Sequence, residues 1–135
     1  MSCILRITGK NFDVDDFIRQ SKILPYDTFY KGIPRTKSGP NGEKLNFSGC
    51  SLEVSKANFD EFNQQVQEAV DYLNNHQQKL QHIKLTPEIQ YATLDFAVEY
   101  NPDKFTQTQY LPTELLKLSV DLGIGIEISI YQQSE

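Results

Sequence analysis

The chain has 135 residues, 39% of them hydrophobic, and its aromatic residues are seven Tyr and eight Phe with no Trp. This length and composition predict one domain over residues 1–135 that folds without a disulfide or metal, and they exclude a disordered chain. The net charge of −5 argues against a general nucleic-acid binder, which needs clustered Lys and Arg.

The first half of the chain predicts two strands with a helix and a long connection between them. Cys3–Thr8 is a strand that Gly9 ends, and Asp13 is placed to cap a short helix with Asp15 and Asp16 in its first turn. Cys50, Leu52 and Val54 alternate with polar residues in a second strand, which spans residues 47–55.

The connection at residues 29–44 is the one basic stretch, with four basic residues against Glu43. Its glycines and prolines exclude a regular helix, and its glycine spacing is not that of a phosphate-binding P-loop. One interpretation is an exposed loop that binds an acidic or phosphorylated partner, and the alternative is a solvated connection whose aromatic residues dock on the core. The candidate binding residues are Tyr26, Phe29, Tyr30, Lys31, Arg35 and Lys37.

The second half predicts a long helix, a strand, a helix and a final strand. Asn58 is placed to cap the long helix with Glu61 in capping-box position, and an apolar stripe from Phe59 to Leu73 follows. Residues 88–100 alternate as a strand, and residues 101–103 form a turn. A helix starting at Pro112 ends at Gly123, and isoleucines at every second position mark a last strand over residues 124–131.

The alternation in each strand predicts a sheet with one face covered by helices and the other open. The element order therefore favours an α+β fold, a ferredoxin-like two-layer sandwich with a four-stranded, mostly antiparallel sheet and three helices on one face.

The open face of that sheet is the second candidate site, because the polar positions of all four strands should point the same way. Such a face is either ordinary solvated surface or a surface for a partner or a second copy. Asp95 and Glu127 would also come close together if the last two strands are neighbours, which leaves a catalytic carboxylate pair as a further alternative. The residues that define the candidate surface are Arg6, Glu53, Asp95, Glu127 and Tyr131, together with Thr8, Ser51 and Glu99.

Two other clusters have simpler explanations than a metal site. The Asp13–Asp16 cluster lacks the spacing of a calcium-binding loop and fits helix capping. His76 and His82 are too far apart to share one helix face, and no Cys lies near them. We therefore expect no metal and no cofactor.

Three segments together resemble a family of small bacterial α+β domains of unknown function. They are the Asp-rich start "RITGKNFDVDDF", the segment "FYKG" and the terminal "LPTELLKLSVDLGIGIEISIY". The absence of Trp departs from the family pattern. The resemblance implies a bacterial origin and a compact single domain, and it brings no catalytic residues. Some small bacterial domains of this kind neutralise a toxin, and the acidic balance of this chain would suit a basic one.

The sequence thus favours a non-enzymatic interaction protein, with a protein partner or a homodimer and with neither nucleic acid nor membrane as its target. The alternative is a small-molecule-binding domain, with or without weak hydrolytic activity, and an enzyme proper is the third class. The N-terminal region lacks a basic start followed by a long apolar run, and no stretch approaches the ~20 apolar residues of a membrane span. Cys3 and Cys50 fit buried free thiols, so we expect a cytoplasmic protein.

Overall fold

A computed structural model describes residues 1–34 and 42–132. Five strands form one sheet with the order β2-β3-β1-β4-β5. The strands are β1 (Cys3–Gly9), β2 (Asp27–Phe29), β3 (Ser48–Ser55), β4 (Tyr91–Glu99) and β5 (Gly125–Tyr131), and the helices are α1 (Val14–Ser21), α2 (Phe62–Asn75), α3 (Gln77–Leu80) and α4 (Thr113–Leu122), with a 3-10 turn at Gln81–Ile83.

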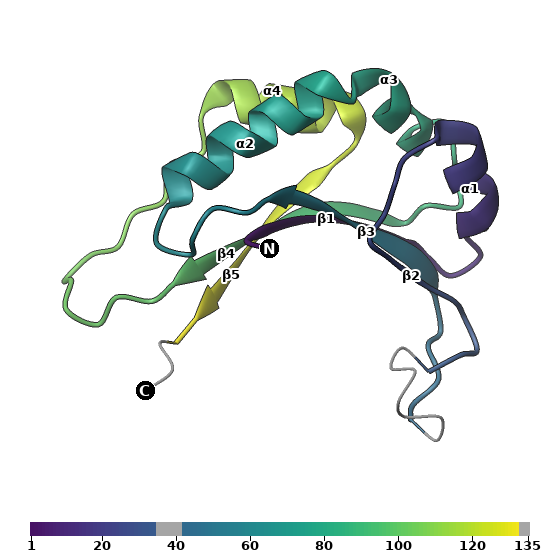
Figure 1. Cartoon of the computed structure of the whole chain (residues 1–135), viewed down its shortest axis with the longest axis horizontal. Helices are drawn as coiled ribbons and strands as arrows, with labels where there is room; N and C mark the ends of the chain where they lie inside the picture. Colours follow the sequence, from purple (N-terminus) through teal and green to yellow (C-terminus); the bar gives the residue numbers. More distant parts are fainter. Residues whose placement is uncertain (35–41, 133–135) are drawn as a thin grey trace.

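The helices lie over one face of the sheet, and the sheet arches away from them (Figure 1). Strand β1 is central and pairs antiparallel with β3 on one side and with β4 on the other. Strand β5 pairs parallel with β4, because the chain returns through α4 before it re-enters the sheet.

The core lies between the helices and the covered face of the sheet. Leu5, Leu94 and Phe96 are fully buried there, and Leu73 of α2 and Leu115 of α4 reach the same layer from the helices. A two-layer α+β architecture with one covered face is therefore confirmed.

The ferredoxin-like prediction was wrong in its details, since the described part of the chain holds a mixed sheet of five strands and four helices. Strand β2 has only three residues, which is too short to give an alternation signal, and it adds to the sheet beside β3. The sequence pattern of β5 does not distinguish a parallel neighbour from an antiparallel one.

The long helix also begins later than predicted. Asn58 N donates to Glu61 Oε1 (3.1 Å), as half of a capping box would, but the backbone at Glu61 is not helical and α2 starts at Phe62. Phe59 therefore lies outside the helix, and its ring packs on Tyr131 with centroids 5.6 Å apart. At the other end the helix stops at His76, whose Nδ1 lies 2.8 Å from the carbonyl oxygen of Tyr72.

Two glycines have positions that a side chain would disturb. Gly123 ends α4 with φ 75°, and this left-handed conformation suits glycine. A Cβ on Gly49 would lie 2.3 Å from the carbonyl oxygen of Ile7 and 2.8 Å from the ring of Phe29. The absence of a side chain at Gly49 thus allows the Phe29 ring of β2 to pack closely against β3.

Candidate functional site

The open face of the sheet carries the residues that the alternation predicted. Arg6 in β1 lies opposite Ser51 of β3 and Thr93 of β4, and Asp95 of β4 lies opposite Glu127 of β5. In β1 and β4 these positions alternate with buried ones, and β3 and β5 pair with those strands in register, so all of these residues share the face turned away from the helices. Glu53 and Tyr131 lie on the same face, at β3 and β5.

An ion pair forms the centre of this face. Arg6 Nη1 lies 3.5 Å from Asp95 Oδ2, and Ser129 Oγ donates to Asp95 Oδ1 at 2.6 Å. The Asp95 side chain is 14% exposed and the Arg6 side chain 31%, so both lie partly below the surface. Among the described residues, Arg6 Nε and Ser51 Oγ are buried without a hydrogen-bond partner. Asp95 is therefore the principal partner that holds the guanidinium in place.

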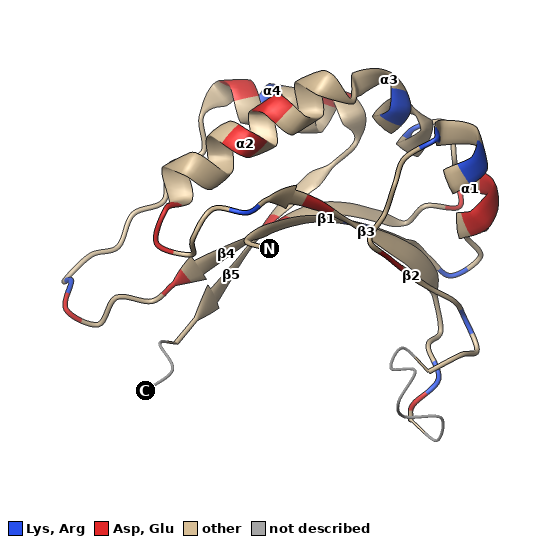
Figure 2. Ribbon diagram, viewed as in Figure 1, with Lys and Arg blue, Asp and Glu red and all other residues tan. Residues whose placement is uncertain are grey.

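The carboxylates on this face outnumber its one guanidinium. Five acids occupy open-face positions of the strands against the single guanidinium of Arg6, with which one of them pairs, and they are Asp27, Glu53, Asp95, Glu99 and Glu127. Lys56, just beyond β3, lies 3.5 Å from Glu53 and partly compensates it. Figure 2 shows acidic residues on the strands themselves. The open face is thus predominantly acidic.

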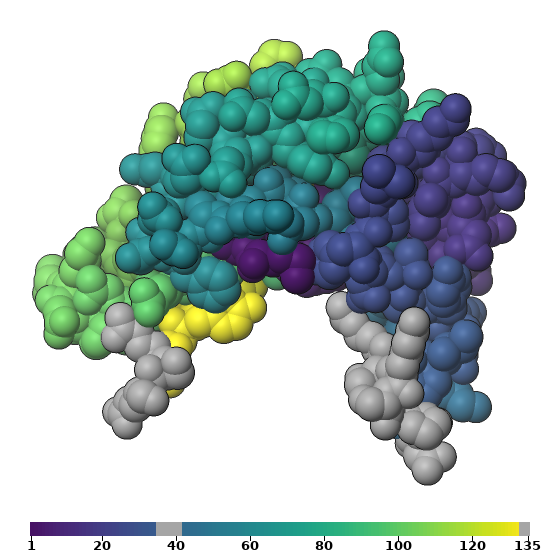
Figure 3. All heavy atoms as spheres, viewed as in Figure 1, coloured from purple at the N-terminus to yellow at the C-terminus, as the bar shows by residue number. Residues whose placement is uncertain are grey.

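The shape of the face is concave. The space-filling view is hollowed beneath β1 (purple in Figure 3), between the side that carries β5 and the 100–110 segment and the side that carries residues 42–47. A small cavity of about 160 Å³ lies within the hollow, lined by Arg6, Thr8, Tyr91, Thr93 and Glu127. Tyr91 is 69% exposed at its rim. The hollow is wide and its cavity is small, which suits a broad contact better than an enclosed ligand.

The basic connection is only partly described. Tyr30 Oη donates to Asp15 Oδ1 of α1 (2.7 Å), and Lys31 N donates to Ser48 Oγ (2.9 Å). Gly32 N donates to the carbonyl oxygen of Leu45 (2.8 Å), so the two ends of the connection run side by side. The candidate residues Arg35 and Lys37 lie outside the described residues.

Two residues of the Asp13–Asp16 cluster have different structural roles. Asp13 accepts a hydrogen bond from Asp16 N and caps α1, as predicted, whereas Asp15 anchors Tyr30. The role of Asp15 could not be predicted from sequence, because Asp15 and Tyr30 come together only in the folded chain.

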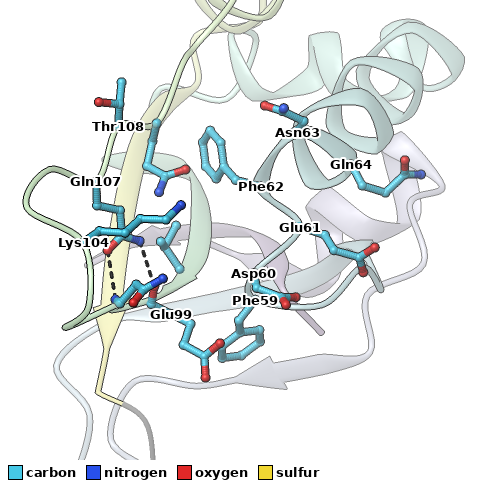
Figure 4. Close-up of a pocket in the computed structure, with 13 residues that line it drawn as sticks. Phe59, Asp60, Glu61, Phe62, Asn63, Gln64, Glu99, Lys104, Gln107 and Thr108 are labelled. Atoms are coloured by element: carbon cyan, nitrogen blue, oxygen red, sulfur yellow. Dashed lines mark hydrogen bonds between the residues drawn. The ribbon is translucent and has the colours of Figure 1, made fainter.

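A larger cavity, of about 670 Å³, lies at the start of α2 and was not predicted (Figure 4). Phe59 and Phe62 give it an apolar wall, and Lys104 extends into it from the 101–109 segment. Gln107 holds that segment in place, since its Nε2 donates to the carbonyl oxygen of Glu99 (2.8 Å) and its Oε1 accepts from Asn101 N (3.1 Å). The sequence had identified residues 101–103 only as a turn, and nothing in it indicated that the following residues form a wall.

The cysteines and histidines are held in structural contacts. Burial raises the pKa of Cys50 to about 12, and burial together with the charge of Asp95 raises the pKa of Cys3 as well. Both thiols therefore stay protonated and unreactive at neutral pH. His76 stacks on Tyr72 with ring centroids 4.2 Å apart. Within residues 1–34 and 42–132, no three His, Cys, Asp or Glu side chains gather closely enough to hold a metal ion.

Comparison with known proteins gives one match. The family model "Domain of unknown function (DUF4279)" matches residues 1–133. No curated protein and no solved structure matches the chain. The resemblance to a family of domains of unknown function is thereby confirmed. No helix in the described part of the chain combines the length and apolarity needed to cross a membrane.

Proposed function

This chain belongs to the DUF4279 family, whose function is unknown, and we propose that it is a protein-binding module whose concave sheet face receives a basic partner. The observation that carries the proposal is the set of carboxylates on the open face, where five acids accompany one guanidinium. A partner with clustered Lys or Arg complements this charge, and such complementarity sets specificity and the rate of association.

The shape of the face supports the same proposal. No described segment covers the central strands on this side, and the sheet arches around a wide hollow (Figure 3). The central pair, Arg6 with Asp95, is held by Ser129 and by its partly buried position, so the middle of the surface is ordered before any partner arrives. Preordered side chains lose less conformational entropy on binding.

The test is affinity capture from a lysate of the source cells, with the wild type beside two matched double variants. Glu53→Gln/Glu127→Gln removes two open-face carboxylates, and Asp71→Asn/Asp121→Asn removes two exposed carboxylates from α2 and α4. Both variants change the net charge equally. We expect a basic partner that the first variant binds roughly tenfold more weakly, about 1.4 kcal/mol, and that the second binds normally. Added salt should weaken the wild-type complex. A partner that both variants retain equally would refute the proposal.

A second candidate function is the binding of a small polar molecule in the cavity at the start of α2. Its volume of about 670 Å³ is in the range of ligand pockets. Its lining combines the Phe59 and Phe62 rings with the Lys104 ammonium and with three carboxylates, those of Asp60, Glu61 and Glu99. A thermal-shift screen of small zwitterions, which carry a positive group for the carboxylates and a negative group for Lys104, should then show stabilisation that Lys104→Ala abolishes. Equal shifts for wild type and variant would exclude this function.

A further inference from the structure

Strand β5 is a long, regular edge of the sheet. It lies at the end of the strand order, and within the described residues it pairs only with β4. Its register with β4 is continuous from Gly125 to Tyr131, without a bulge. On the helix side, Ile128 is 38% exposed and Ile130 is 66% exposed. An edge with these properties is a template for pairing with another strand.

The opposite edge of the sheet lacks these properties. Strand β2 has three residues, begins with Asp27 and lies between Pro25 and Gly32. Proteins commonly protect sheet edges by such short strands, charges and prolines. Strand β5 contains no Lys, Arg or Pro, and its one charge is Glu127. The fold therefore protects one edge and leaves the other open.

The backbone groups that β5 offers can be identified. The carbonyl oxygen of Tyr131 accepts a hydrogen bond from Tyr100 N (2.8 Å), so the backbone groups of Tyr131 point toward the β4 side. The N–H and C=O groups of one residue in a strand point to the same side, and those of the next residue point to the opposite side. The backbone groups of every second residue therefore point away from β4, toward the open edge, and these residues are Ile126, Ile128 and Ile130.

We propose that the domain forms a two-fold symmetric dimer in which β5 pairs antiparallel with β5 of a second copy, centred on Ile128. Ile128 then faces its own equivalent, and Ile126 faces Ile130 of the other copy. All three pairs are of the hydrogen-bonded kind, because all three residues point outward. The isoleucine side chains meet on the helix side, where such cross-strand pairs stabilise a sheet.

The open-face side chains also fit this register. Glu127 lies opposite Ser129 of the other copy, and Tyr131 lies opposite Gly125, so no like charges meet. Shifting the centre to Glu127 would place the two Glu127 carboxylates directly opposite each other, which is destabilising. Shifting it to Ser129 would leave Ile126 beyond the pairing. The strand is thus self-complementary in one register, as a two-fold interface requires, and this property identifies a second copy as the occupant.

The dimer would join two five-stranded sheets into one continuous sheet. Opposite residues of paired strands share a face, so both helical layers lie on one side and both concave faces lie on the other. Each copy keeps its open face, which makes the dimer independent of the acidic surface proposed to bind a partner.

The first test measures mass in solution by light scattering over a concentration series. We expect twice the chain mass for the wild type, and the chain mass for Ile128→Pro and Ile130→Lys. The Ile128 N–H points outward, so proline there spares the pairing with β4, as edge strands allow. Leu85→Lys is the matched control, because Leu85 is 74% exposed and lies far from β5 in the chain, and it should remain dimeric. A monomeric wild type, or a dimer that survives both β5 variants, would overturn the proposal.

The second test fixes the register by disulfide formation. In the proposed dimer the Ile128→Cys thiols face each other across a Cα separation of about 5.5 Å, which a disulfide can span. The Ile130→Cys thiols lie roughly 13 Å apart along the strand and should not join. Cys3 and Cys50 are buried and do not interfere. Mild oxidation should therefore give a covalent dimer only with Ile128→Cys. Equal cross-linking of the two variants would refute the register.

Discussion

Leu5 and Arg6 are neighbours in β1, but Leu5 is fully buried beneath the helices whereas the Arg6 side chain is 31% exposed on the open face. The same contrast holds in β4, where Phe96 belongs to the core and Asp95 to the acidic surface. In this domain, residues that stabilise the fold therefore alternate along each strand with residues of the surface proposed to bind a partner. A shift of one residue in any strand would exchange the two faces, so packing on the covered side fixes the open side as well.

The sharpest test of that separation is Phe96→Ala. Phe96 is fully buried and packs on Phe62 with ring centroids 5.4 Å apart, so its loss should lower the free energy of unfolding by about 3–5 kcal/mol. Asp95→Ala, one residue away, leaves Arg6 without its carboxylate and should cost about 1 kcal/mol, because Arg6 keeps access to water. Urea unfolding of both variants measures the difference. Equal losses in the free energy of unfolding would show that both faces contribute equally to stability.

Gly49→Ala tests whether the open face has its own packing requirement at the β2 end. The new methyl group would collide with the carbonyl oxygen of Ile7 and with the Phe29 ring, and backbone cannot move aside easily. We expect a loss of about 1–3 kcal/mol by thermal or urea unfolding. Gly32→Ala offers a contrast, since no atom lies within 4 Å of a Cβ there, although its φ of 84° adds backbone strain. A neutral Gly49→Ala would mean that β2 is not tightly docked.

Alkaline pH should lower the stability of the fold through the two buried cysteines on the covered face. The pKa of Cys50 is raised by burial from its usual 9.0 to about 12, so the fold favours the thiol over the thiolate. This contribution is complete below pH ~9 and is lost as pH rises toward ~12, because the unfolded chain ionises first. Each thiol should cost about 1 kcal/mol per pH unit in that window. Cys3→Ala/Cys50→Ala should flatten the decline in melting temperature, and an unchanged slope would contradict the assignment.

The smallest effect on stability is expected for Glu127→Gln. Glu127 is exposed on the open face, and a surface substitution of this kind changes the free energy of unfolding by less than about 0.5 kcal/mol. The proposed partner should nevertheless bind more weakly. A large loss of stability, seen in urea unfolding, would mean that Glu127 supports the fold and that the two faces are less separate than their residues indicate.

Alternation and capping made most elements predictable from sequence. Asp13 and Gly123 mark helix ends as expected, and the strands β1, β3, β4 and β5 follow their period of two. The parallel pairing of β5 and the added strand β2 escaped prediction, because both depend on tertiary contacts rather than on the local pattern.

The same limit applies to the candidate sites. The open face follows from the alternation of polar and apolar residues, which is enough to place Arg6, Asp95 and Glu127 on one side of the sheet. The cavity beside Lys104 depends on two segments about 40 residues apart, at the start of α2 and after β4, and on the Gln107 hydrogen bonds that fix one of them. No spacing in the sequence signals such a meeting.

The central place of β1 has a consequence for how the protein is made. This strand precedes the others in the chain, but its neighbours are β3 and β4, whose residues Ser55 and Phe96 pair with Cys3. A growing chain therefore carries β1 with one edge unpaired until β4, at residues 91–99, has been synthesised. Such distant pairings slow folding relative to helical proteins of similar size. We expect chains halted before β4 to be bound by chaperones or degraded, because the central strand is synthesised before the two strands that pair with it.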